Sequence, residues 1–113
     1  MTTPTPRQPG RLDVEELADW RRQGVAMQII DVREPWEVEI CALADAVNVP
    51  LGSLPGRLDA ISADLPLVLV CHHGARSQSA VNFLLSRGYG AALNLTGGID
   101  AWARRVEPGM AVY

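Results

Sequence analysis

Residues 71–77 read Cys-His-His-Gly-Ala-Arg-Ser and hold the side chains of this sequence that are best suited to chemistry. They follow an apolar run at residues 65–70, which is typical of a buried strand. A thiolate is a strong nucleophile, and main-chain N–H groups at a helix N-terminus stabilise its negative charge. Because Gly74 allows the loop to turn and Arg76 adds a positive charge, the pattern predicts that Cys71 is an activated nucleophile.

Cys71 and its neighbours also have simpler interpretations, which their position in the chain disfavours. A cysteine often packs as a small apolar side chain, but a loop at the carboxyl edge of a parallel sheet favours ligand binding. A metal site made of Cys71, His72 and His73 is disfavoured because three adjacent residues rarely converge on one ion, so we expect no metal. The two histidines are expected at the rim of a pocket. The residues expected to bind substrate are His72, His73, Gly74, Ala75, Arg76 and Ser77.

A second group of charged residues follows an earlier apolar run, at residues 25–32. Asp31 and Arg33 are expected to form an ion pair that supports the reactive loop, and a direct role in chemistry stays open. Cys41 is expected to be a core or half-buried thiol, and a disulfide with Cys71 also stays open. Trp36 and Trp102 are interpreted as packing or pocket-wall residues.

The elements that must position these side chains alternate between helical and strand patterns. Asp13 and Glu16 form a capping-box pattern that predicts a helix ending near Gly24. Predicted strands cover residues 25–32, 46–49, 65–70 and 91–95. Predicted helices cover residues 51–61, the segment from Ser77 to Gly88, and short stretches after residues 34 and 98. This alternation predicts an α/β fold with a parallel sheet.

Composition limits the class of protein. The chain has 113 residues, of which 48% are hydrophobic, and a net charge of −3, so we expect one folded domain at residues 11–113 behind a flexible tail at residues 1–10. A pI near 5.2 without a basic cluster argues against a nucleic-acid partner. The apolar runs are too short for a membrane span. Two cysteines without an export signal predict a cytoplasmic location, and we expect a monomer or weak dimer.

Residues 71–77 resemble the active-site loop of the single-domain rhodaneses, which are thiosulfate sulfurtransferase-like proteins. The family pattern is Cys, two variable residues, Gly, one variable residue, Arg, and then Ser or Thr. Three further stretches carry the resemblance in the family's order: Asp-Val-Arg-Glu-Pro at 31–35, Ala-Val-Asn-Val-Pro-Leu at 46–51 and Leu-Thr-Gly-Gly-Ile-Asp-Ala-Trp at 95–102. The resemblance implies a three-layer α/β domain with a central, mostly parallel five-stranded sheet flanked by helices.

The resemblance also implies a reaction. A Cys71 persulfide would carry sulfane sulfur from a small anionic donor, such as thiosulfate or a persulfide, to a thiol or cyanide acceptor, without a cofactor. His72 stands where many active members have Arg, which removes one positive charge and predicts weaker activity on small anionic donors.

Two other functions stay open at this stage. One is a persulfide carrier that delivers sulfur to a protein partner with little turnover on small molecules. The other is a cysteine-based phosphatase or arsenate reductase. Four residues separate Cys71 from Arg76, whereas the phosphatase pattern has five, so the loop length favours sulfur chemistry.

Overall fold

Five parallel strands form the centre of the protein, which is described over residues 3–113 in a computed structural model. Their spatial order is β1-β5-β4-β2-β3. The strands are β1 (Arg11–Leu12), β2 (Gln28–Asp31), β3 (Val47–Asn48), β4 (Leu67–Val70) and β5 (Ala92–Leu95). The fold class predicted from the sequence is confirmed, and every pairing is parallel rather than most of them.

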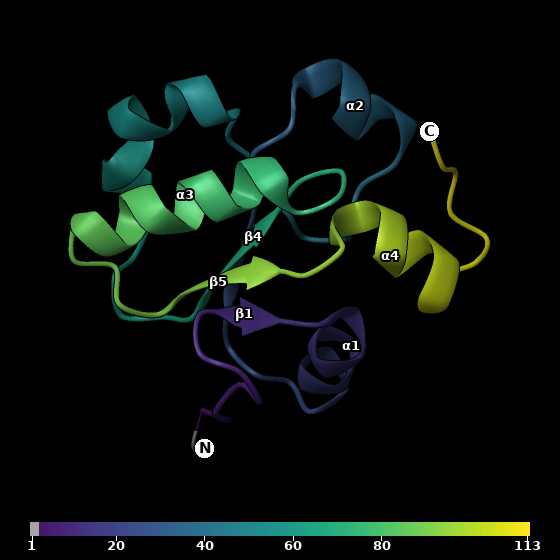
Figure 1. The fold of residues 1–113 in the computed structure, drawn as a ribbon, viewed down its shortest axis with the longest axis horizontal. Helices are drawn as coiled ribbons and strands as arrows, with labels where there is room; N and C mark the ends of the chain where they lie inside the picture. The colour runs from purple at the N-terminus through teal and green to yellow at the C-terminus, as the bar shows by residue number, and fades with distance from the viewer. Residues whose placement is uncertain (1–2) are drawn as a thin grey trace.

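Helices cover both faces of this sheet (Figure 1). They are α1 (Val14–Arg22), α2 (Pro35–Ile40), the 3₁₀ helix η1 (Leu51–Ala60), α3 (Ala75–Ser86) and α4 (Gly98–Arg105). Helices α1 and α4 share one hydrophobic cluster, and α3 and η1 share another. The chain therefore forms three layers, and the sheet is the middle one.

Alternation along β4 explains why the two clusters lie on opposite faces. Val68 and Val70 pack in the cluster of α1 and α4, whereas Leu67 and Leu69 pack in that of α3 and η1. All four are fully buried, as expected for a central strand of a parallel sheet. Cys71 continues the second set and therefore lies on the α3 face.

Most predicted elements are present, with shorter strands than the apolar runs suggested. The capping box at the start of α1 is confirmed, since Asp13 accepts from the Glu16 N–H at 2.7 Å. The helix predicted over residues 51–61 is a 3₁₀ helix, and Pro55 inside it cannot donate a main-chain hydrogen bond. Strand β1 was not predicted because two residues carry no periodicity.

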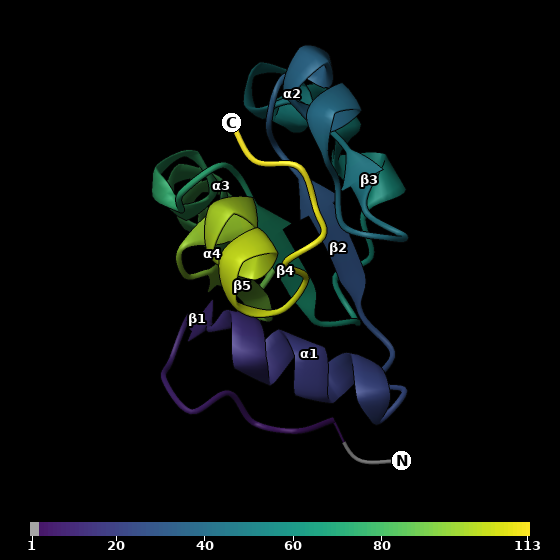
Figure 2. The same cartoon turned by 90° about the vertical axis from the view of Figure 1, so that its right-hand side faces the viewer.

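Within residues 3–113, segments near both ends of the chain contact the domain. The predicted tail includes residues 1 and 2, which lie outside the described residues. Within the rest of that tail, the Arg7 N–H donates to the Glu16 carboxylate at 2.9 Å. Figures 1 and 2 show the segment after α4 running back toward α2. Over residues 3–113, no helix combines the length and the apolar character needed to cross a bilayer.

Candidate active site

Strand β4 delivers Cys71 to the carboxyl edge of the sheet, at the entrance to α3. Gly74 precedes the first residue of that helix, and its φ of +116° lies in the left-handed region that favours glycine. The turn brings the Gly74 N–H to 3.0 Å from the Cys71 Sγ, to which it donates. The strand–loop–helix arrangement predicted from the sequence is therefore present, with a main-chain donor on the sulfur.

A buried polar network holds the other side of the sulfur. The hydroxyl of Ser77 lies 3.2 Å from the Cys71 Sγ and donates to the Asn94 Oδ1 at 2.5 Å. The amide of Asn94 in turn donates to the Gly74 carbonyl at 3.2 Å, which fixes the orientation of the amide group. Asn94 was not among the predicted site residues, although a polar residue inside the apolar run of β5 was a usable signal.

Arg76 does not carry a free charge into the loop. Its guanidinium donates two hydrogen bonds to the carboxylate of Glu37, at 2.6 and 2.7 Å. Glu37 is a buried residue of α2, and these bonds lower its pKa to about 2. The same pair raises the pKa of Arg76. Sequence analysis predicted contact between Arg76 and a bound anion, and the structure gives this cation a protein partner.

The predicted ion pair of Asp31 and Arg33 is present and fully buried. The Arg33 Nη2 lies 2.6 Å from the Asp31 Oδ2, and it also donates to the Cys41 carbonyl at 2.7 Å. Burial alone would lower the pKa of Arg33, but the hydrogen bonds with Asp31 and Tyr113 outweigh it and raise the pKa. This pair anchors α2, and α2 holds Arg76 through Glu37, so the support reaches the loop in two steps.

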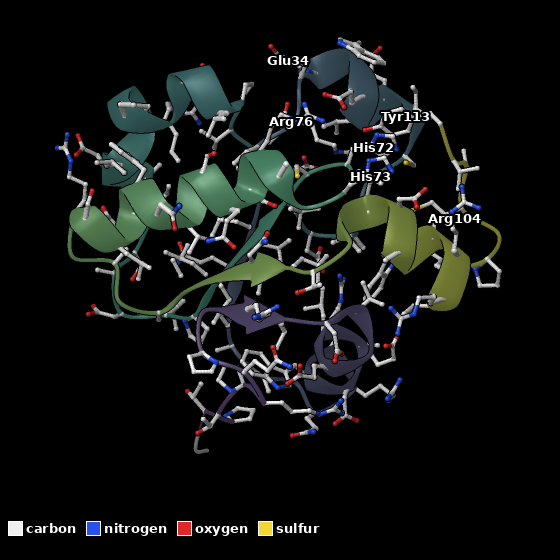
Figure 3. All side chains as sticks on the ribbon, in the orientation of Figure 1. Glu34, His72, His73, Arg76, Arg104 and Tyr113 are labelled. Carbon is white, nitrogen blue, oxygen red and sulfur yellow. The ribbon has the colours of Figure 1, made fainter. Side chains whose placement is uncertain are left out.

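Tyr113 joins this network from the far end of the chain. Its hydroxyl donates to Glu37 at 2.8 Å and accepts from Arg33 at 3.0 Å. Its ring stacks on His72, with ring centroids 3.9 Å apart and planes 7° from parallel. Figure 3 shows Tyr113 beside the two loop histidines. Nothing in the local sequence pattern indicated this contact, because Tyr113 and His72 are 41 positions apart.

Helix α4 docks directly onto the reactive loop. The N–H groups of Ile99 and Asp100 donate to the carbonyls of Cys71 and His72, at 2.9 and 3.1 Å. A side chain at Gly98 would place its Cβ 2.4 Å from the Cys71 carbonyl oxygen, so only glycine permits this approach. The Gly-Gly motif of residues 97 and 98 thus fixes the distance between the loop and α4.

Within this frame the Cys71 side chain is deeply placed, since the residue is only 1% exposed. A cavity of about 410 Å³ opens at the opposite edge of the sheet, near Met27 and Gln28, and includes no residue of the 71–77 loop. His72 and His73 lie at the outer side of the loop, where sequence analysis placed a pocket rim. Access to the sulfur therefore depends on movement of the residues around it.

A family comparison identifies this arrangement. The model of the rhodanese-like domain matches residues 13–105. This chain belongs to the rhodanese-like domain family. A sulfurtransferase of Allochromatium vinosum is 37% identical over 97 residues, which are 86% of this chain and 91% of that protein. The chain is a rhodanese-domain sulfurtransferase by homology, as the resemblance implied.

Larger proteins contain the same domain. The adenylyltransferase and sulfurtransferase MOCS3 of Drosophila ananassae is 39% identical over 111 residues, which cover 91% of this rhodanese-like chain but only 24% of MOCS3. Among solved structures, the rhodanese-like domain protein of Staphylococcus aureus has a TM-score of 0.77 at 27% identity. The match covers 89% of this chain and 95% of that one, and it confirms the rhodanese-like fold.

Proposed function

We propose that this protein transfers sulfane sulfur from a small donor to a thiol or cyanide acceptor through a persulfide on Cys71. The observation that carries the proposal is the placement of the Cys71 Sγ, which accepts from the Gly74 N–H at 3.0 Å at the start of α3. A main-chain donor and the positive end of a helix stabilise a charged sulfur in the thiolate and in the persulfide alike.

The proposed reaction has two steps. The Cys71 thiolate attacks the outer sulfur of thiosulfate, the sulfur–sulfur bond of the donor breaks, and sulfite leaves with the bonding electron pair. A thiolate or cyanide then attacks the outer sulfur of the Cys71 persulfide. Thiocyanate or the acceptor's persulfide leaves, and the Cys71 thiolate is restored. Both steps are nucleophilic displacements at sulfur, so the loop amides serve in each.

Charge around the loop bears on the choice of donor. Arg76 is paired with Glu37, and Arg104 donates to both carboxylate oxygens of Asp100. The cations nearest the loop thus already have protein anions as partners. A dianion such as thiosulfate gains little from paired cations, whereas the persulfide group of a donor carries at most one negative charge. We therefore propose that a low-molecular-weight persulfide is a better donor than thiosulfate.

Persulfide formation tests the mechanism. Intact-mass measurement after incubation with thiosulfate, or with a cysteine persulfide generated in place, is expected to show one added sulfur atom on the wild-type protein. The Cys71→Ser variant is expected to gain none. Cys41→Ser is the matched control, because Cys41 is the other cysteine of the chain and is half-buried. Sulfur found on Cys41 instead of Cys71 would overturn the proposal.

Turnover tests the donor preference and the alternatives. Sulfur transfer to cyanide or to a thiol is expected to fall roughly 1,000-fold or more in Cys71→Ser, as for loss of other catalytic nucleophiles. A higher kcat/KM with the persulfide than with thiosulfate supports the charge argument. A labelled Cys71 without turnover on small acceptors would indicate the carrier function. Hydrolysis of an aryl phosphate without sulfur transfer would indicate a phosphatase, which the bidentate pair of Arg76 and Glu37 disfavours.

A further inference from the structure

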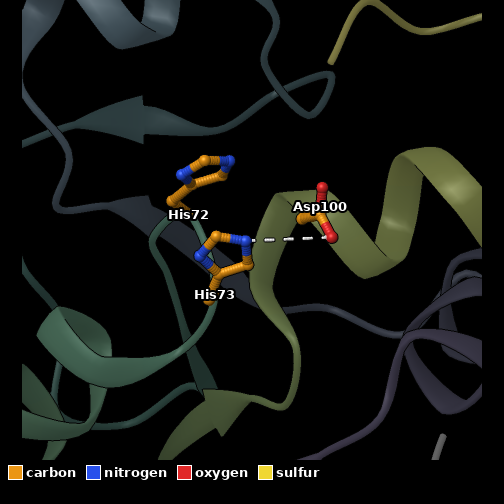
Figure 4. A group of neighbouring side chains, drawn as sticks. All are labelled: His72, His73 and Asp100. Carbon is orange, nitrogen blue, oxygen red and sulfur yellow. Dashed lines mark ion pairs between the residues drawn. The ribbon is translucent and has the colours of Figure 1, made fainter. Parts of the chain in front are cut away.

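The side chains of His72, His73 and Asp100 come together on the outer side of the reactive loop. Each offers one ligand atom, and these three atoms all lie within 4.8 Å of one another. Figure 4 shows the two imidazole rings side by side, each with a nitrogen on the side that faces the Asp100 carboxylate. Two histidines come from the loop and the aspartate from α4, and His73 and Asp100 are 27 positions apart in sequence.

One atom of this cluster has an unmet requirement. The His72 Nε2 is buried and has no hydrogen-bond partner among the described residues, which is unusual for a buried polar atom. An imidazole nitrogen without a hydrogen-bond partner can offer its lone pair to a metal ion.

Asp100 already has a cationic partner, since Arg104 donates to both of its carboxylate oxygens. Arg104 itself is exposed, with 62% of its side chain accessible, so it can move aside at small cost.

The backbone holds the three residues in a fixed relation. The Asp100 N–H donates to the His72 carbonyl at 3.1 Å, and Gly98 lets α4 approach the loop closely. In a tetrahedral zinc site, metal–ligand distances of about 2.0–2.1 Å place ligand atoms about 3.3 Å apart. Because the present atoms are up to 4.8 Å apart and the two imidazole rings are stacked, the side chains must turn toward a common point to bind one ion. His73 has the freedom to turn, because its side chain is 67% exposed.

We propose that His72, His73 and Asp100 bind a divalent transition-metal ion of the Zn²⁺ class, and that the bound ion ties the reactive loop to α4 and slows sulfur transfer. Two imidazoles and one carboxylate are a common ligand set for Zn²⁺ and leave one position for water. The binding site stands independently of the reaction, whereas the slowing of sulfur transfer rests on the proposed function. The ion restrains His72 and His73, next to Cys71, in a loop that must move to expose the sulfur.

Metal binding by itself is the first test. Co²⁺ absorption and Zn²⁺ competition are measured on tag-free protein, and the Cys71→Ser variant is included. Asp100→Asn and His73→Gln are each expected to weaken binding roughly 100-fold or more, because each removes one of three protein ligands. Asp19→Asn is the matched control and should bind like the wild type, since Asp19 is also a helical aspartate paired with a nearby arginine.

The same spectra decide between ligands. Nitrogen and oxygen ligands give Co²⁺ visible bands without the intense near-ultraviolet charge-transfer band of a thiolate. Binding that survives in Cys71→Ser and is weakened in Asp100→Asn supports the site. Binding that is lost in Cys71→Ser, or is unchanged in both Asp100→Asn and His73→Gln, overturns it.

Sulfur transfer is the second readout. Zn²⁺ is expected to lower the rate of the wild type in a chelator-reversible way, and the inhibition is expected to need roughly 100-fold more Zn²⁺ in Asp100→Asn. Asp100→Asn also frees the charge of Arg104 near the loop, so the Zn²⁺ inhibition of each protein is expressed relative to its own metal-free rate. Bound Zn²⁺ with an unchanged rate would overturn the inhibitory role. Absence of any sulfur transfer would instead contradict the proposed function and leave the binding test to stand alone.

Discussion

Two strand–loop–helix units of this protein share the same backbone arrangement but carry different side chains in their loops. In the first, β2 leads through residues 32–34 into α2; in the second, β4 leads through residues 71–74 into α3. The first unit holds Asp31 and Arg33, whose opposite charges face each other without exposure to solvent. The second holds Cys71, whose sulfur contacts a main-chain N–H and a hydroxyl.

This difference indicates that the first unit supports the structure and that the second unit performs the chemistry. Charges in the first unit are satisfied by one another and by the Cys41 and Glu37 carbonyls, so they rigidify α2. The sulfur of the second unit is the one strong nucleophile at that edge among the described residues, and the Gly74 N–H that donates to it can stabilise a persulfide as well as a thiolate. Changes in the first unit should therefore act mainly on stability, and changes at Cys71 mainly on activity.

The largest effect on stability is expected from Arg33→Met. It leaves the Asp31 carboxylate buried without its cation, and breaking a buried pair costs about 3–5 kcal/mol. Urea denaturation measures the free energy of unfolding. The double variant with Asp31→Asn should recover part of the loss, because no isolated charge remains. A loss below about 1 kcal/mol in Arg33→Met would remove the distinction between the two units.

The next largest effect is expected from Glu37→Gln, because Glu37 connects the two units. The loss of two charged hydrogen bonds to a partly exposed Arg76 should cost about 2 kcal/mol. It also frees the Arg76 charge near the loop, so the KM for thiosulfate is expected to fall while that for a neutral donor stays constant. Steady-state kinetics with both donors measures this. A rise in KM for thiosulfate would show that Glu37 positions Arg76 for the donor.

Acid pH should weaken the ion pair between Glu37 and Arg76. The pKa of Glu37 is lowered from 4.5 to about 2, chiefly by its hydrogen bonds from Arg76. A lowered carboxyl pKa stabilises the folded state fully above the unfolded value, and the gain is lost as the pH falls from about 4.5 through about 2. Unfolding free energies measured across this range should converge for wild type and Glu37→Gln at the acid end. Curves that stay parallel would contradict the assignment.

The smallest effect is expected from Tyr113→Phe. It removes the hydroxyl contacts with Arg33 and Glu37 and keeps the ring that stacks on His72, so the loss should be about 1 kcal/mol. Tyr113→Ala also removes the ring. The alkylation rate of Cys71 is expected to rise in Tyr113→Ala and to stay near the wild-type value in Tyr113→Phe. Equal rates in all three proteins would show that the stack does not restrict access.

Local patterns predicted the parts of the structure that local physics decides. The apolar runs located the central strands, and the capping residues located α1. The strand–Cys–Gly–helix order located the reactive sulfur, because a parallel strand must deliver it to the carboxyl edge. The Asp31 and Arg33 pair was predictable for the same reason, since both residues lie at the end of one strand.

The sequence by itself determined the α/β class, the nucleophile and its loop, because period, turn residues and chain order are local properties. Only the tertiary structure decided which groups surround that loop. Glu37 neutralises Arg76, Asn94 holds Ser77, and Tyr113 stacks on His72. These partners come from other strands, helices and the distant C-terminal segment, and their approach depends on how the layers pack. The charge of a side chain follows from the sequence, but the packing of the layers determines which group pairs with it.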